Sequence, residues 1–367
     1  MKVLIVSNQP NNKFVNGGNS CNERNRSYFE RYFGKGNVFT YEIKRQKSKY
    51  SHFANCIKKI ILGANKKDCQ SISQILKEQD IDILFFSNTF NGDLIYKFRN
   101  KKIIVFAHNV EYLFVKQEIK KYNFLKKCIY NSKLLLTKRN EKKSVLYSDL
   151  FFTLNKRDSL EFDNIYGDFK KKLLPMSIKD TYKTKTITET ISGLSQDYML
   201  FVGFNFFGNT EGLFWFINNV LDSVPYKLIV CGYGMEKYNN SFPDKNVLFN
   251  GYVENLENYY QNASFVILPI ISGSGMKTKT AEALMYGKYI IGTKEAFCGY
   301  DIDIEKVGAL CNSKEEFIEF INKFHSNKHP LYNKYSRKIF EEKYSDEQVY
   351  KLFEKYIGDF INNESLS

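Results

Sequence analysis

Short runs of consecutive apolar residues, most of them ending in a polar or small residue, recur along the whole chain. Strands buried on both faces of a sheet show such continuous runs, whereas half-exposed strands alternate. Helical patterns lie between several runs, and this predicts βαβ units and parallel sheets. The runs are 2–7, 82–88, 102–109 and 149–155 in the first half, and 198–204, 226–232, 246–252, 264–270 and 289–293 in the second.

Residues 176–197 separate the two groups of predicted strands. The segment is rich in Thr, Ser and Lys and has no sustained apolar run, which is typical of a linker. We therefore expect an α/β protein with a Rossmann-like domain at 1–175, a second at 198–345, and a C-terminal helical segment at 346–367 that packs back on the first domain. Gly17 and Gly18 are expected in a loop before a helix from about Asn22 to Phe33.

The two halves differ in charge. Residues 1–175 hold 34 of the 54 basic and 16 of the 40 acidic residues, a net charge of +18, and the rest carries −4. This asymmetry predicts an anionic partner for the first half. The seven Cys form no C-x-x-C pair and match no zinc pattern, so reduced cytoplasmic thiols are expected. We expect no signal peptide and no membrane helix, which needs an apolar run of about 20 residues.

The sequence GSGMKTKTAEALMYGK begins at Gly273, just after the apolar run 264–270 and before a predicted helix that ends at Gly287. Glycine backbone N–H groups and the positive end of a helix both attract anions. Lys277 can pair with phosphate oxygens, and Glu282 can accept hydrogen bonds from two ribose hydroxyls. Together these groups suit a nucleoside diphosphate. A tight turn followed by solvated side chains is the alternative, because short glycine motifs also arise by chance.

This stretch resembles the donor-binding signature of retaining GT-B glycosyltransferases, in particular glycosyltransferase family 4. There G-x-G-x-K-x-K-x-x-E-A precedes a helix end, a Gly and a strand. The resemblance covers most of residues 1–325 and implies the GT-B fold, two Rossmann-like domains that face each other across a cleft. Other segments resemble the family in the same order: 16–18, 106–112, 138–158, 201–221, 228–234 and 246–269.

The resemblance implies roles for individual residues. Glu282 would bind the donor ribose, and His108 would reach the transferred sugar. Gly17 and Gly18 would let the first domain approach the donor. The diphosphate would be held by Lys277 and by the amides of Gly273, Ser274, Gly275 and Met276. The nucleobase would lie near Gly232, Tyr233, Tyr252 and Val253.

The sequence departs from the family pattern in two places. Ser274 stands where many members carry a sugar-binding Glu. Phe204 and Asn209 stand where many have an Arg and a Lys, so Lys277, alone or together with Lys279, would carry the phosphate charge. We expect Lys279 on a solvated helix face.

Sugar transfer builds negative charge on the leaving diphosphate, and amides, a helix N-terminus and lysine stabilise it without a metal. We therefore expect no metal and no cofactor, and attribute the D-x-D sequences at 80–82 and 301–303 to chance. His108 and Lys277 are the catalytic candidates. A structural role is the alternative for His108, because a lone His at a strand end is more often structural.

Residues 116–143 hold ten Lys or Arg and two Glu. Apolar side chains interleave with them at near-helical spacing, which predicts one amphipathic, cationic helix that lies on anionic lipid. A core-facing stripe with a solvated outer face is the alternative. The apolar positions are Phe114, Ile119, Tyr122, Leu125 and Ile129.

We therefore expect a retaining glycosyltransferase that moves a sugar from a nucleotide-sugar donor to a glycan acceptor. The expected acceptor is a lipid-linked intermediate of a bacterial surface polysaccharide, such as O-antigen, capsule or lipopolysaccharide core. The protein would be cytoplasmic and peripheral on the inner face of the cytoplasmic membrane. The alternatives are an epimerase or hydrolase of nucleotide sugars and a non-catalytic nucleotide-sugar-binding protein. A nucleic-acid-binding protein would leave residues 273–282 unexplained, so nucleic acid is not an expected partner.

Overall fold

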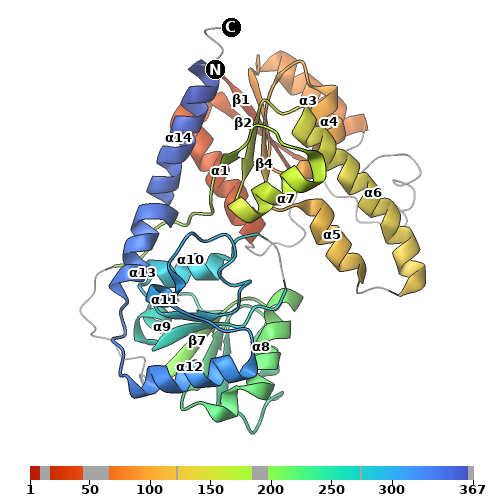
Figure 1. Ribbon diagram of the computed structural model, residues 1–367. Coiled ribbons are helices and arrows are strands. Elements are labelled where there is room, and N and C mark those ends of the chain that lie inside the picture. The colour runs from red at the N-terminus through yellow and green to blue at the C-terminus, as the bar shows by residue number, and fades with distance from the viewer. Residues whose placement is uncertain (9–16, 44–65, 121–122, 184–196, 273–274, 363–367) are drawn as a thin grey trace. The chain divides into compact units, whose positions relative to one another are not determined.

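The computed structural model describes residues 1–8, 17–43, 66–120, 123–183, 197–272 and 275–362 (Figure 1). The chain divides into two compact units. Unit 1 consists of Met1–Pro175 with the residues from Tyr350 onward, and unit 2 consists of Met176–Val349.

A parallel sheet forms the centre of unit 1, and in the described residues it has six strands in the order β2-β1-β3-β4-β5-β6. Every side chain of β3 and β5 is buried, as continuous apolar runs require. The strands are β1 (Val3–Asn8), β2 (Val38–Ile43), β3 (Ile83–Phe86), β4 (Lys102–Ala107), β5 (Leu150–Thr153) and β6 (Lys172–Leu173).

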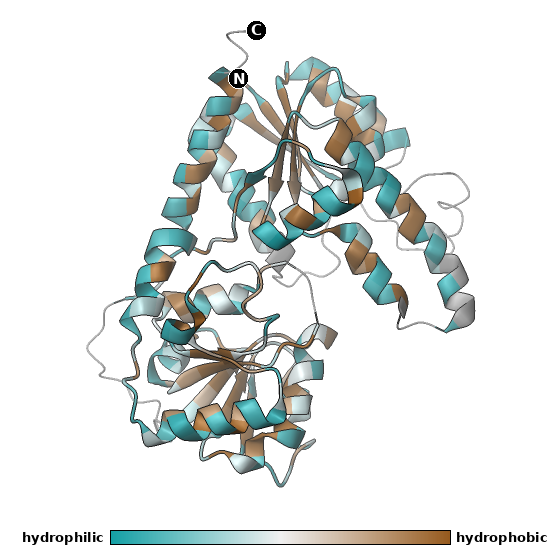
Figure 2. Cartoon of the chain, in the orientation of Figure 1, coloured by the Kyte–Doolittle hydropathy of each residue, from teal (hydrophilic) through white to brown (hydrophobic). Residues whose placement is uncertain are grey.

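The helices of unit 1 present polar residues outward and apolar residues toward the sheet (Figure 2). From Tyr350 onward the last helix belongs to this unit, where Phe353 packs on Tyr28 and Phe29 with ring centroids 5.4 and 5.0 Å apart. The helices are α1 (Gly17–Phe33), α3 (Lys66–Glu78), α4 (Gly92–Lys97), α5 (Glu111–Lys120), α6 (Phe124–Leu146), α7 (Lys156–Tyr166) and α14 (Asp346–Asn362).

Unit 2 has a second parallel sheet, with six strands among the described residues in the order β12-β11-β10-β7-β8-β9. The chain runs outward from β7 to β9 and then returns to place β10 on the other side of β7. The loops after β7 and β10 therefore leave the sheet in opposite directions, which opens a crevice at the carboxyl ends of these strands. The strands are β7 (Tyr198–Val202), β8 (Lys227–Cys231), β9 (Val247–Gly251), β10 (Phe265–Leu268), β11 (Ile290–Gly292) and β12 (Gly308–Leu310).

Two helices of unit 2 begin beside this crevice, α8 after β7 and α10 after β10. Gly287 follows α10 with φ of +59°, so it ends the helix as predicted. The helices are α8 (Phe207–Asn219), α9 (Glu257–Asn262), α10 (Thr278–Met285), α11 (Ile304–Val307), α12 (Lys314–Ser326) and α13 (Lys334–Ile339), and a π-helical turn covers Phe340–Tyr344.

The predicted α/β chain with two parallel sheets is confirmed, and each of the nine apolar runs contains a strand. The strands β2, β6 and β12 were not predicted, and three predicted segments differ from the structure. Gly17 and Gly18 are the first residues of α1 and not part of a loop, because the helix begins five residues before Asn22. The start of the predicted linker is anchored in unit 2, where Ile178 pairs with Ser345.

The third difference concerns the basic segment at 116–143. It forms two helices, α5 and α6, so the prediction of one helix is wrong. The interleaved apolar stripe also divides, because Ile119 is buried whereas Phe114 is 38% exposed. Tyr122 and the side chains of Leu125 and Ile129 lie outside the described part of the structure. In the described ranges no helix is both long and apolar enough to cross a membrane.

Candidate functional site

The crevice of unit 2 is shaped by a close approach of two loops. The backbone N–H of Gly203, after β7, donates to the carbonyl of Cys231 at the end of β8 (2.9 Å). A Cβ added at Gly232 would lie 2.0 Å from the carbonyl oxygen of Gly203, so only glycine fits there. Two exposed aromatic side chains stand beyond these strand ends, Tyr233 after β8 and Tyr252 after β9, with Val253 next to the latter.

Glu282 lies in the second turn of α10. Its carboxylate accepts a hydrogen bond from the hydroxyl of Tyr260 on α9 (2.9 Å). Burial raises the pKa of the Glu282 carboxyl, and the Tyr260 hydrogen bond and the Lys279 ammonium act in the opposite direction. The ring of Tyr260 is stacked on Tyr286, with centroids 4.6 Å apart, which fixes the position of its hydroxyl.

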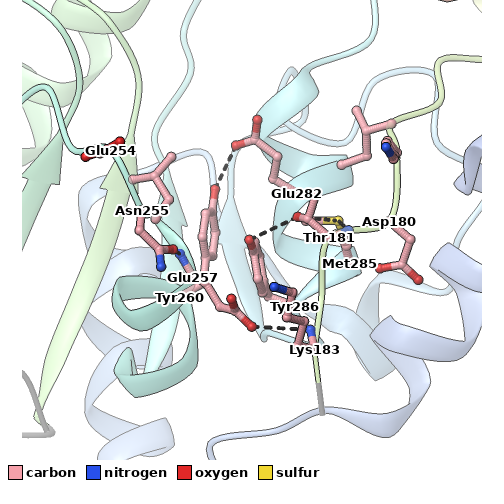
Figure 3. A pocket seen from close by; sticks show the side chains of 13 residues that line it. Asp180, Thr181, Lys183, Glu254, Asn255, Glu257, Tyr260, Glu282, Met285 and Tyr286 are labelled. Carbon is pink, nitrogen blue, oxygen red and sulfur yellow. Dashed lines mark hydrogen bonds between the residues drawn. The ribbon is translucent and has the colours of Figure 1, made fainter. Parts of the chain in front are cut away.

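Glu282 and Tyr260 line a pocket of about 670 Å³ (Figure 3). Its walls come from α9, α10, the segment after β9 and the start of the predicted linker. The pocket is large enough for a nucleoside, since ligand pockets typically measure about 300–1,000 Å³. The remaining lining residues are Ile178, Lys179, Asp180, Thr181, Lys183, Glu254, Asn255, Leu256, Glu257, Met285 and Tyr286.

Lys277 is the residue before α10. Its ammonium forms an ion pair with Glu295 (2.7 Å) and donates to the carbonyl of Gly275 (3.1 Å). The hydroxyl of Tyr300 donates to the Lys277 carbonyl (2.6 Å). The predicted phosphate lysine therefore already has a carboxylate partner in this structure.

The glycine-rich segment before α10 is described only in part. Gly275 has φ of +65°, a conformation that favours glycine, and the side chain of Met276 is buried. The N-terminus of α10 has no side-chain cap, and although the N–H of Thr280 donates to the Lys277 carbonyl (3.1 Å), the positive end of the helix favours an anion. Gly273 and Ser274 lie outside the described residues.

Lys279 differs from its prediction. Only 8% of its surface is exposed, so the expected solvated helix face is wrong. Its ammonium donates to the side-chain oxygen of Asn209 on α8 and lies 4.8 Å from the centroid of the Phe201 ring. Burial lowers the pKa of Lys279 to about 7, although Glu282 acts to raise it. The physical reason is that α10 turns this side chain toward β7, which the sequence spacing alone does not reveal.

His108 lies in unit 1, directly after β4. Its Nε2 atom is 3.5 Å from the hydroxyl of Ser87, which follows β3, and its ring packs edge-on against Phe106. Burial, together with the nearby Arg24 guanidinium, lowers the pKa of His108 to about 4, so the ring is neutral at pH 7. Unit 1 thus brings His108 to the carboxyl edge of its sheet, while Gly17 and Gly18 lie in the first turn of α1.

Three further residues of unit 2 belong to the candidate site and were not predicted. Tyr260 and Glu295 bind the predicted residues Glu282 and Lys277, and Asn209 binds Lys279. Nothing in the local sequence marks Tyr260 or Glu295, because each reaches its partner across the fold. In the described residues no group of three or more His, Cys, Asp or Glu side chains could hold a metal ion.

Residues 196–327, within unit 2, match the family model described as "Glycosyl transferases group 1". No curated protein matches the chain in sequence. The match covers little more than a third of the chain, and together with the fold it supports a transferase enzyme of the glycosyltransferase type.

Several solved structures resemble this chain over nearly its whole length. The lipopolysaccharide outer core galactosyltransferase WaaB shares 14% identity at a TM-score of 0.65, covering 99% of this chain and 100% of its own. WaaG, a glycosyltransferase involved in lipopolysaccharide biosynthesis, shares 18% sequence identity at a TM-score of 0.65, and the match covers 98% of this chain and 99% of WaaG. Anabaena HepE in complex with UDP shares 11% sequence identity at a TM-score of 0.70, and the match covers 98% of this chain and 100% of HepE. The chain therefore has the GT-B glycosyltransferase fold.

Proposed function

We propose that this protein is a retaining glycosyltransferase of family 4 that uses a nucleotide-sugar donor, with UDP as its nucleotide. The observation that carries the proposal is the position of Glu282, whose half-buried carboxylate lines a nucleoside-sized pocket beside the crevice of unit 2. One carboxylate oxygen is held by Tyr260, and the remaining acceptor capacity suits ribose hydroxyls. The solved structure of HepE with UDP supports the choice of base.

The leaving diphosphate would lie at the uncapped N-terminus of α10, next to Gly275 and Met276. There the backbone N–H groups and lysine charge stabilise the negative charge that grows as the glycosidic bond breaks. Tyr233, Tyr252 and Val253, after β8 and β9, would contact the base together with Gly232. This arrangement needs neither a metal nor a cofactor.

His108 is neutral at pH 7, because burial holds its pKa near 4. A neutral imidazole can donate a hydrogen bond to a sugar hydroxyl from one ring nitrogen and accept one at the other. We therefore assign His108 a hydrogen-bonding role toward the transferred sugar.

The proposed acceptor is a lipid-linked intermediate of a bacterial surface polysaccharide. The similarity to WaaB, a lipopolysaccharide outer core galactosyltransferase, and to WaaG, which is involved in lipopolysaccharide biosynthesis, supports this class of acceptor. In unit 1, the exposed apolar side chain of Leu135 lies near the exposed charges of Lys138 and Arg139 along α6. Such a surface suits anionic lipid headgroups, so we propose a peripheral position on the inner face of the cytoplasmic membrane.

The test is thermal unfolding of the full chain with UDP, GDP or dTDP and their glucose conjugates. A ligand that binds only the native state raises the melting temperature, by an increment that grows with its concentration. UDP and a UDP-sugar are expected to stabilise the protein most. Absence of stabilisation by every nucleotide at millimolar concentration contradicts the proposal.

The stereochemistry needs a separate measurement. The sugar that stabilises the protein is supplied as its UDP conjugate with a lipid-linked acceptor, and the anomeric configuration of the product is read by NMR. The retaining assignment predicts that the product keeps the configuration of the donor. Release of free sugar or an epimerised nucleotide sugar, with no transfer, would instead identify an epimerase or hydrolase.

A further inference from the structure

The ammonium of Lys279 occupies an unusual place at the crevice of unit 2. It comes from α10, after β10, but lies against the loop after β7. A Cβ added at Gly203 would be 3.1 Å from Nζ and 2.9 Å from the side-chain nitrogen of Asn209. Lys279 therefore links the two loops that diverge at the strand-order reversal, where ligands of parallel sheets bind.

The direct contacts of Lys279 within the described part of the chain include no acidic side chain. Its hydrogen-bond partner is the neutral side-chain oxygen of Asn209, whose own nitrogen donates to the Phe204 carbonyl (2.8 Å). Among the described residues Lys279 forms no ion pair, whereas Lys277 is paired with Glu295. A buried ammonium without an ion-pair partner costs stability. The Phe201 ring and the Glu282 charge, which acts on the ammonium without forming an ion pair, offset part of this cost, and a bound anion would offset more of it.

Both helices that start here have N-termini without a side-chain cap. α8 begins after Phe206 and α10 after Lys277, and neither of these side chains accepts a hydrogen bond from the helix backbone. Asn209 lies in the first turn of α8, so the lysine nitrogen, the first turn of α8 and the first turn of α10 converge. Each of these groups favours negative charge.

We propose that Lys279, and not Lys277, supplies the positive charge for the diphosphate of the donor, and that Asn209 holds the lysine in place before the donor binds. The inference rests on the proposed function and names a residue for its phosphate subsite. It also accounts for Asn209 at a position where many members of the family have a basic residue, because the ammonium of Lys279 on α10 supplies the positive charge there instead. In this assignment Lys277 fixes the start of α10 through Glu295.

The test compares ligands with and without phosphates. Isothermal titration calorimetry measures the affinity of UDP and of uridine for the wild-type protein and for Lys279→Met. The variant is expected to lose ten- to a hundredfold in UDP affinity and to keep its uridine affinity within about twofold, because only the diphosphate meets the lysine. An unchanged UDP affinity, or an equal loss for both ligands, overturns the inference.

Lys288→Met is the matched control. Lys288 is also buried in unit 2, burial also lowers its pKa to about 7, and it donates to the carbonyls of Gln261 and Leu331. Its removal is expected to leave the UDP-to-uridine affinity ratio unchanged. If Lys279→Met does not fold, Lys279→Gln keeps a donor for Asn209 without the charge and is expected to show the same selective loss of UDP.

The proposed function and the role of Lys279 are contradicted by different results. A wild-type protein that binds neither UDP nor uridine contradicts the proposed function. A wild-type protein that binds UDP, combined with a Lys279→Gln or Lys279→Met variant that binds it equally well, contradicts only the role of Lys279.

Discussion

The hydroxyl of Tyr260 donates a hydrogen bond to the carboxylate of Glu282 across 2.9 Å, and so joins α9 to α10 (Figure 3). Burial raises the pKa of Tyr260 well above its ordinary value, so this hydroxyl stays protonated and remains a donor. The bond fixes the orientation of a carboxylate that is otherwise exposed to the pocket. Nucleotide affinity should therefore depend on Tyr260, which need not touch the ligand.

Tyr260→Phe is expected to weaken UDP binding about three- to tenfold, because a typical hydrogen bond contributes about 0.5–1.5 kcal/mol. The stacking on Tyr286 is kept in this variant, so the fold should be retained. Titration calorimetry measures the effect. Tyr259→Phe is the control, since that hydroxyl accepts from Asn250 (3.2 Å) and makes no hydrogen bond to Glu282. An equal loss in both variants would show that Tyr260 acts through general packing.

Glu282→Ala is expected to reduce the affinity for UDP and uridine alike, by about 1–3 kcal/mol, since ribose hydroxyls lose their acceptor. This pattern is opposite to that expected for Lys279, where only UDP is affected. Comparing uridine with 2′-deoxyuridine in the wild type isolates one of the two hydroxyls. Equal binding of uridine by the wild type and Glu282→Ala contradicts the ribose assignment.

The pH dependence of UDP binding should report Lys279. In the free protein burial holds its pKa at about 7, and a bound diphosphate would raise it, so binding takes up a proton. UDP affinity is therefore expected to fall as pH rises from 7 to 9, above the second phosphate pKa of about 6.

The charged groups that act on this ammonium are Glu282, which raises its pKa, and Lys277, which lowers it. β7 and α8 present Phe201 and Asn209, neither of which titrates. Calorimetry in buffers of different ionisation enthalpy measures the proton uptake directly. The uptake should vanish in Lys279→Met, and an identical uptake in that variant would assign it to another group.

Gly232→Ala should distort the crevice, because the added methyl group would lie 2.0 Å from the Gly203 carbonyl. Overpacking of this kind typically costs about 1–3 kcal/mol. A lower melting temperature and weaker UDP binding are expected together, as the loops after β7 and β8 are forced apart. Gly36→Ala is the control, since a Cβ there meets no atom within 4 Å. A Gly232→Ala variant with unchanged melting and UDP affinity would contradict this contact.

His108 should titrate far below the ordinary range for histidine. NMR is expected to show its ring protonating near pH 4, with the resonance assigned by its absence from His108→Gln. The unfolded chain takes up this proton near pH 6.5, so the contribution of His108 destabilises the folded state progressively as pH falls from about 6.5 to about 4. A midpoint near 6.5 would contradict the buried, neutral assignment.

The nine apolar runs predicted strands correctly because a strand buried on both faces leaves a local signature that needs no knowledge of its neighbours. Three edge strands gave no such signal: β2 has a single buried residue among its six, and β6 and β12 have only two and three residues. The first turn of α1 was missed for a related reason, since two glycines have low helix propensity and tertiary context overrides it. Glu282 was identified by its place after a glycine-rich turn, and its second-turn position agrees with that prediction.

What the sequence determined by itself was the set of buried strands and the position of Glu282 on the helix after β10. What the tertiary structure decided was the partner of each polar side chain. Lys277 and Lys279 are two residues apart and look alike in sequence, yet one is paired with Glu295 and the other is buried against Asn209. Lys277 precedes α10 in extended backbone, whereas Lys279 lies in its first turn, so the two side chains point in different directions. Only the packing of α10 against its neighbours determines which lysine meets a carboxylate and which meets an amide oxygen.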